Sequence, residues 1–312
     1  MIDYSMFSPN LGIKEKHFDR NSLKYAELNG LLKSIYMHFC PFFVPNEIYA
    51  YLLRINQKVS ILSDVMVLKS DLGRLVESSS NWKNASIDMF GGYWVQALYI
   101  HKDDDLSSYP CAPENIKVYA CMKTTDVQIV FVDSLKYLLE RAGNSFGAKV
   151  ATCSRADQMC YWLSQNDFKH LEDFYKMYDD NLDTSMPFVA YKGKLGISKD
   201  FPGVDPSHNV LLVDIIVDYL NTVNNVDDVD IEDMFNNYIA KWNGEVEEET
   251  MYGFREQTAL SFVVILDTMD AILDGTGITE HSLLTGGEKK MWNLLARSRS
   301  WDDVKELRRR PL

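Results

Sequence analysis

The chain has 312 residues, of which 46% are hydrophobic and 25% charged, a balance that excludes disordered, collagen-like and membrane-spanning classes of protein. Its net charge of −13 at pH 7 argues against a protein that grips nucleic acid through phosphate contacts alone. We therefore expect a globular protein whose partners include neither nucleic acid nor a membrane.

The sequence offers no membrane or secretion signal. No stretch reaches the about 18 consecutive apolar residues that cross a bilayer, since Asp214 and Asp218 interrupt the apolar stretch 211–220. Residues 1–18 lack a positive region followed by an apolar core, so no classical signal peptide is expected. These features predict a cytoplasmic protein, and an effector translocated into a host cell is the alternative.

Cysteine and histidine patterns predict no metal centre. The five cysteines are scattered without a Cys-x-x-Cys pair, and the six histidines never form a His-x-x-x-His arrangement. Free thiols are therefore expected rather than a disulfide framework or a zinc site. The chain also lacks a glycine-rich phosphate loop and a Gly-x-Ser-x-Gly motif, so neither a metal nor a cofactor is assigned.

The N-terminal region predicts two helices. After Ser22, apolar residues recur at three- and four-residue steps, a spacing typical of an amphipathic helix. Pro41 and Pro45 are expected to end this helix, and Asn46 is expected to cap a second one.

The segment that follows gives weaker signals. Residues 59–76 mix β-branched and polar side chains without a clean period, and residues 78–86 form a polar connector. Residues 90–100 begin with Gly91-Gly92 and continue as a run typical of a β-strand. We therefore predict one strand in this part of the chain.

The central stretch alternates between strand and helix patterns. The predicted elements, in chain order, are strand 116–122, helix 127–141, strands 146–153 and 158–163, helix 167–178, strand 187–197 and helix 210–223. This order predicts an α+β fold, with a mixed or antiparallel central sheet, helices on one face, and helical N- and C-terminal segments. The predicted divisions are residues 1–110, a core at 111–225, and an acidic and helical segment at 226–312.

The C-terminal region is acidic around an aromatic patch. Phe235, Tyr238 and Trp242 lie among aspartates and glutamates, a pattern typical of a solvated face with loops around a helix. An apolar helix is predicted at 259–273, and a charged helical tail at 288–310.

Cationic and hydroxyl side chains lie on or beside predicted strands that are otherwise apolar: Lys117, Tyr119, Lys149, Arg155 and Lys192. The two-residue period of a strand places Lys117 and Tyr119 on the same face. Lys149 interrupts a run that would normally be buried, which costs several kcal/mol unless the ammonium is paired or hydrated. Lys149 is therefore expected to face a cleft, although each strand lysine taken alone also fits the solvent side of a half-exposed sheet.

These residues belong to short motifs in a fixed order. They are Lys117-Val118-Tyr119, the phenylalanine-led strand 146–150 with its lysine, Arg155-Ala156-Asp157 before an apolar strand, and the proline-led stretch 187–196 with its lysine and glycine. Together they resemble the core of the HopA-type family, named for a type III secretion effector of plant-pathogenic bacteria. Proteins of this kind also occur in clusters for class V lanthipeptides and thioamitides, which are ribosomally made, modified peptides (RiPPs).

The resemblance implies a lyase that works with a separate kinase. The kinase phosphorylates Ser or Thr of a precursor peptide, and the HopA-like protein removes the phosphate by β-elimination to leave a dehydroamino acid. The layout is similar to that of the phosphothreonine lyases, whose strand carries Lys-x-His where this chain has Lys117-x-Tyr119. The implied partners are a phosphorylated peptide and a kinase, and no cofactor is implied.

Such an elimination needs a base for the Cα proton and an acid or cation for the leaving phosphate. Lys149, on the most apolar strand, is the candidate base, because burial or neighbouring positive charges favour its neutral form by lowering its pKa from about 10.4. Tyr119 is the candidate proton donor to the leaving group. Lys117 is the candidate that neutralises the phosphate or the enolate-like oxygen.

The phosphate also needs contacts of its own. Arg155 offers bidentate geometry for a phosphate, and Lys192 is the second candidate contact. Asp157 is expected to orient Arg155 or Lys149 rather than to touch the substrate.

The chain departs from the family pattern at one helix. Ser207-His208-Asn209 replaces a Ser-Phe-Gly start, and Leu212 stands where an arginine of the first turn is expected. The alternative is therefore a non-catalytic type III effector or kinase-binding scaffold with the same fold. A third interpretation is an unrelated α+β protein whose strand lysines lie on the surface.

Overall fold

The computed structural model describes residues 15–77, 80–104, 115–123, 126–184, 186–198 and 207–242. The chain divides into two compact units, one formed by Leu52–Lys199 and the other by Met1–Tyr51 with Asp200–Leu312. The predicted helix at 259–273 and the predicted tail at 288–310 lie outside the described residues. Within the described residues, no helix combines the length and the apolar character needed to cross a membrane.

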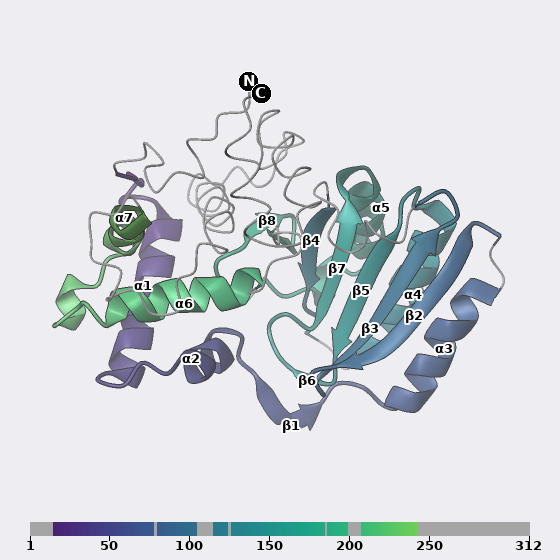
Figure 1. Cartoon of the computed structure of the whole chain (residues 1–312), viewed down its shortest axis with the longest axis horizontal. Coiled ribbons are helices and arrows are strands. Elements are labelled where there is room, and N and C mark those ends of the chain that lie inside the picture. The colour runs from purple at the N-terminus through teal and green to yellow at the C-terminus, as the bar shows by residue number, and fades with distance from the viewer. Residues whose placement is uncertain are drawn as a thin grey trace, which may run out of the picture. The chain divides into compact units, whose positions relative to one another are not determined.

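An antiparallel sheet dominates the unit Leu52–Lys199 (Figure 1). Across the described residues its strand order is β2-β3-β5-β7-β4-β9-β8, and each neighbouring pair runs antiparallel. The strands are β2 (Trp82–Phe90), β3 (Trp94–His101), β4 (Asn115–Ala120), β5 (Phe146–Ala151), β7 (Met159–Ser164), β8 (Ala190–Lys192) and β9 (Leu195–Ser198). A small second sheet joins β1 (Asn56–Ser60) to β6 (Cys153–Ser154).

Three helices of this unit cover one face of the large sheet: α3 (Val65–Glu77), α4 (Val127–Arg141) and α5 (Gln165–Lys176) (Figure 1). The buried Tyr161 of β7 joins two of these helices, because its hydroxyl lies 2.8 Å from the Ser134 hydroxyl and 2.7 Å from the Tyr175 hydroxyl. Tyr99 of β3 donates to the Leu72 carbonyl in α3 at 3.4 Å. We call this side the helix face, and it confirms the predicted α+β fold with helices on one face.

The other unit is helical in its described part. Its helices are α1 (Leu23–Phe39), α2 (Pro45–Leu52), α6 (His208–Leu220), α7 (Ile231–Trp242) and the short η4 (Val226–Asp228). Ser22 caps α1, since its hydroxyl accepts from the Tyr25 amide at 3.0 Å. The helical N-terminal pair and the helix near 210–223 are therefore confirmed.

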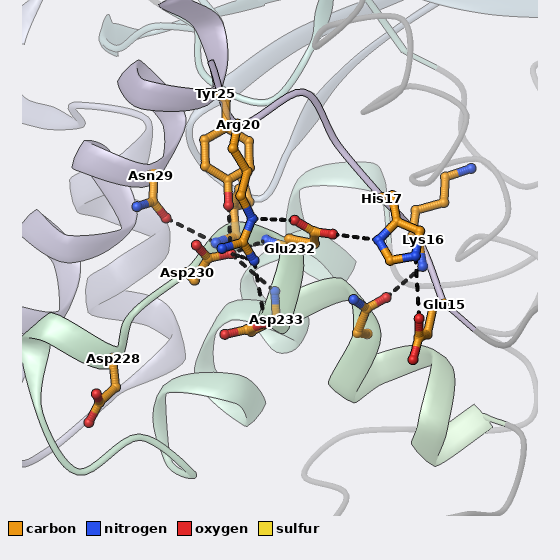
Figure 2. Close-up of polar contacts among 12 residues, drawn as sticks. Glu15, Lys16, His17, Arg20, Tyr25, Asn29, Asp228, Asp230, Glu232 and Asp233 are labelled. Carbon is orange, nitrogen blue, oxygen red and sulfur yellow. Dashed lines mark hydrogen bonds and ion pairs between the residues drawn. The ribbon is translucent and has the colours of Figure 1, made fainter. Parts of the chain in front are cut away.

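Polar contacts tie the N-terminal segment to the start of α7 (Figure 2). The Arg20 Nε donates to a Glu232 carboxylate oxygen at 2.6 Å, and the Tyr25 hydroxyl donates to Asp230 at 2.6 Å. The opposite Glu232 oxygen lies 2.9 Å from a ring nitrogen of His17. Burial of Glu232 raises the pKa of its carboxyl, but the contacts with Arg20 and His17 outweigh burial and lower it. The network fixes where the chain enters α1.

Between the helical pair and β3, the structure contains a helix that the sequence did not predict, and one prediction was wrong. Residues 65–77 form α3, although the sequence shows no clean period there, because only Leu68 and Leu72 of this helix are fully buried while Met66 is 73% exposed. The polar connector predicted at 78–86 overlaps β2, an edge strand that pairs with β3 alone. An edge strand tolerates the polar residues that resemble a connector.

Three further predictions need correction. Pro45 is the first residue of α2 rather than the end of α1, a position where proline is well suited because its missing N–H would be unpaired there. Phe235 and Tyr238 are buried on α7, so the aromatic patch is not a solvated face. The predicted strand 187–197 is a hairpin of β8 and β9, turned at Gly193 with a φ of 60°.

Candidate functional site

The face opposite the helices carries the three residues predicted to perform chemistry. Strand register aligns two rows of side chains across this face. One row is Gln96, Lys149, Cys160, Tyr119 and Gly196, and the adjacent row is Leu98, Gly147, Trp162, Lys117 and Ser198. Residues two apart on a strand share a face, so both rows lie on one side, which we call the cation face.

Lysines 149 and 117 flank one tryptophan. The Lys149 ammonium lies 5.3 Å from the centre of the Trp162 ring, and the Lys117 ammonium lies 5.5 Å from it. The Lys149 ammonium also lies 4.2 Å from the Trp94 ring. All three distances fall in the range where an aromatic ring attracts a cation. The face therefore holds two ammonium groups in a defined place.

A buried arginine continues this cluster. The Arg155 guanidinium lies 4.4 Å from the Trp94 ring, so Trp94 contacts both Arg155 and Lys149. Arg155 binds Asp157 through two hydrogen bonds, one from Nε and one from Nη2, the latter at 3.1 Å. The two side chains are 4% and 3% exposed. The Arg-x-Asp motif is thus a bidentate ion pair.

Cys160 is buried at the centre of the cation face. Its row places it between Lys149 and Tyr119. Burial raises the pKa of this thiol to about 12, against the opposing effect of Lys149, Lys117 and Arg155. Cys160 therefore stays protonated at neutral pH.

Tyr119 has a hydroxyl partner that the sequence did not point to. The Ser198 hydroxyl donates to the Tyr119 phenol oxygen at 3.2 Å, and both residues are buried. The Lys117 ammonium lies 5.5 Å from the Tyr119 ring. Ser198 ends β9, and only the register of β9 against β4 brings it here.

Lys192 is not brought to this cluster. It is exposed, and its ammonium lies 3.6 Å from a Glu172 carboxylate oxygen and 5.3 Å from the Phe168 ring, both residues of α5. Its Cα pairs with that of Leu195, whose neighbour two residues on, Ile197, faces the helices with Val118. Lys192 therefore belongs to the helix face.

The cation face has the chemistry of an anion site. It brings Lys117 and Lys149 to the Trp162 ring and Arg155, paired with Asp157, to the Trp94 ring, in a chain whose net charge is −13. Such a cluster suits a phosphate dianion, and the Tyr119 phenol adds a proton donor. Among the described residues, no group of three or more His, Cys, Asp or Glu side chains is placed to hold a metal ion.

Comparisons with known proteins return little. No protein-family model matches the chain, and no curated protein matches it in sequence. One similar solved structure is described as the effector protein from Pseudomonas syringae pv. tomato strain DC3000. It has a TM-score of 0.45 and 9% sequence identity, and the match covers 72% of this chain and 96% of that one.

Proposed function

We propose that the protein is a lyase that removes phosphate by β-elimination from phosphorylated Ser or Thr of a peptide. The observation that carries the proposal is the cation face, where the Lys117 ammonium lies 5.5 Å from both the Tyr119 and the Trp162 rings, and Lys149 and Arg155 both lie against the Trp94 ring. A substrate phosphate requires cations, which Lys117 and Arg155 supply. The elimination also requires a base, Lys149, and an acid, Tyr119.

The proposed elimination conserves atoms and electrons. The neutral amine of Lys149 takes the Cα proton, and the electrons of that C–H bond form the Cα=Cβ double bond. The Cβ–O bond breaks, and the leaving phosphate oxygen receives the proton of Tyr119. Lys117 neutralises the phosphate or the enolate-like carbonyl oxygen. The products are a dehydroamino acid and inorganic phosphate, and solvent returns Lys149 and Tyr119 to their starting states.

Arg155 is the phosphate contact in this proposal. Its ion pair with Asp157 and its contact with Trp94 hold the guanidinium in place, so less freedom is lost when a phosphate binds. Lys192 has no part in the proposed reaction because it lies on the helix face. In line with the family resemblance, the peptide would be a precursor phosphorylated by a separate kinase.

The test is mass spectrometry of a phosphoserine or phosphothreonine peptide incubated with the protein, alone and with any kinase encoded beside it. Elimination removes the mass of phosphoric acid and leaves an alkene that adds a thiol. A phosphatase removes only the phosphoryl group. Lys149→Ala is expected to abolish the alkene product, whereas Lys136→Ala, at an exposed lysine of α4, is expected to retain it.

A non-catalytic binding protein is the second candidate, and one observation favours it. Leu212, at the position where the family resemblance places an arginine, is a buried residue of α6 and offers no cation to a phosphate. A protein of this kind would bind a phosphopeptide on the cation face without changing its mass. Binding by the wild-type protein with no mass change in the peptide would support this candidate, an effector or kinase-binding scaffold, over the lyase.

A further inference from the structure

A second hydroxyl lies beside the candidate proton donor. Ser198 is fully buried at the end of β9, and its hydroxyl donates to the phenol oxygen of Tyr119 at 3.2 Å. Its Cα is paired with that of Lys117 across β4 and β9. Ser198 therefore lies next to two residues of the proposed reaction, although it lies outside the Lys117-Val118-Tyr119 motif that contains them both.

We propose that Ser198 is a positioning residue, which holds the Tyr119 phenol for proton transfer to the leaving phosphate oxygen and stabilises the phenolate that forms. This inference rests on the proposed function. Because Ser198 donates the hydrogen bond, the proton of the Tyr119 phenol is directed to an acceptor other than Ser198. When that proton leaves, the oxygen becomes an anion, and a hydrogen bond donated to an anion is stronger than one donated to a neutral phenol.

The backbone around Tyr119 fixes this arrangement. Gly196 is the residue of β9 paired with Tyr119. A Cβ atom added at Gly196 would lie 2.8 Å from Cγ2 of Val189, closer than side-chain carbons pack, and 3.6 Å from Cβ of Tyr119. The absence of a side chain at position 196 therefore lets β9 pack closely at the row that contains Tyr119, two residues before Ser198.

A second buried serine–tyrosine hydrogen bond, on the helix face, serves as a control for the one between Ser198 and Tyr119. Ser134 and Tyr161 are both fully buried, and their hydroxyl oxygens lie 2.8 Å apart. No cation among the described contacts of Tyr161 lies near this pair, whose partners are Tyr175 and the sulfur of Met159. Ser134→Ala therefore removes a buried serine–tyrosine hydrogen bond between α4 and β7 without touching the cation face.

The kinetic test measures elimination by Ser198→Ala and Ser134→Ala on one phosphopeptide. We expect Ser198→Ala to lower kcat by about 10- to 100-fold with little change in KM, because the contact strengthens only as the phenolate forms. The alkaline limb of its pH–rate profile should move to higher pH. Ser134→Ala should leave kcat and the profile unchanged, and Ser198→Thr, which keeps the hydroxyl, should retain more activity than Ser198→Ala. Equal kcat and equal pH profiles in Ser198→Ala and the wild type would overturn the inference.

A second measurement needs no turnover. With 3-fluorotyrosine placed at position 119 of the full chain, the ¹⁹F shift titrates the phenol directly. The pKa of this phenol should be higher in Ser198→Ala than in the parent protein, by about one unit, and unchanged in Ser134→Ala. An equal pKa in the parent and Ser198→Ala overturns the inference. A raised pKa in a protein that never eliminates phosphate supports the Ser198 contact and instead contradicts the proposed function.

Discussion

Each face of the large sheet carries a buried tyrosine that is hydrogen-bonded to a serine, but the surroundings of the two tyrosines differ. On the helix face, Tyr161 shares its hydroxyl with Ser134 of α4 and Tyr175 of α5, and burial raises the pKa of the Tyr161 phenol. On the cation face, Tyr119 accepts from Ser198 and lies beside Lys117. The difference is charge: Tyr161 lies among neutral hydroxyls and joins helices to the sheet, whereas Tyr119 lies beside a lysine, as the proton donor that we propose would.

Strand β5 contributes to both faces and shows the contrast within one segment. Lys149 lies on the cation face against the Trp94 and Trp162 rings. Phe146, three residues earlier, is fully buried on the helix face and contacts the rings of Tyr99 and Trp82. Substitution of Lys149 is therefore expected to lower activity, and substitution of Phe146 is expected to lower stability.

The largest effect is expected from Lys149→Ala. Removing the candidate base should lower the rate of elimination by about 1,000-fold or more, because no other described side chain is assigned to take the Cα proton. The free energy of unfolding should change by about 1 kcal/mol or less, since this lysine is only half-buried. Single-turnover kinetics and urea unfolding measure the two quantities. Retained turnover would remove Lys149 from the reaction.

Phe146→Ala should show the opposite profile. Truncating a fully buried phenylalanine leaves a cavity and should lower the free energy of unfolding by about 3–5 kcal/mol. Where the variant remains folded, the cation face keeps its residues, so the rate of elimination at a permissive temperature should fall far less than in Lys149→Ala. A variant that is stable but inactive would show that the two faces are not separable in this way.

The ion pair of Arg155 and Asp157 offers the next largest effect. Asp157→Asn removes the charge partner of an arginine that is 4% exposed, which should lower the free energy of unfolding by about 2–4 kcal/mol. The matched control is Asp133→Asn, which breaks an exposed pair with Lys136 and should cost less than about 1 kcal/mol. Denaturant unfolding of both variants at one salt concentration compares them directly. Equal losses would mean that the buried pair does not hold the cation face.

Sequence reasoning succeeded where a local pattern determines the structure. The two-residue period of a strand predicted that Lys117 and Tyr119 share a face, and the helix predicted at 127–141 coincides with α4. The spacing of Arg155 and Asp157 is also local, and the ion pair forms within three residues. None of these predictions required knowledge of which strands are neighbours.

Sequence reasoning could not predict contacts that depend on the register between strands far apart in the chain. The contact between Ser198 and Tyr119 joins residues 79 positions apart and arises only when β9 pairs with β4. The predicted single strand 187–197 also concealed a turn at Gly193. Because alternate residues face opposite sides of a sheet, a turn restarts the alternation, and this is why Lys192 is found with Glu172 of α5 rather than with the cations.

The smallest expected effect concerns two neighbouring carboxyl groups on α6. Asp214 and Asp218 lie one helical turn apart, and burial together with Asp218 raises the pKa of Asp214 from its ordinary value of 3.8 to about 6. On the cation face, Asp157 offsets part of the like charge, whereas the Asp214 carboxyl keeps its proton up to about pH 6 and below that pH is not repelled by Asp218. The same pair helps to raise the pKa of the buried Tyr238 phenol of α7.

This difference predicts a pH dependence of stability with a definite sign. Between pH 4 and pH 6 the folded protein holds a proton on Asp214 that the unfolded chain has released, so stability falls as the pH rises through this window. Asp214→Asn should remove that slope and raise the free energy of unfolding above pH 6 by about 1 kcal/mol, a discounted figure because Asp214 keeps partial contact with water. Asp228→Asn, at an exposed position of the same unit, should leave the slope intact. Urea unfolding at a series of pH values measures the slope, and a slope that survives in Asp214→Asn would show that Asp214 is not its source.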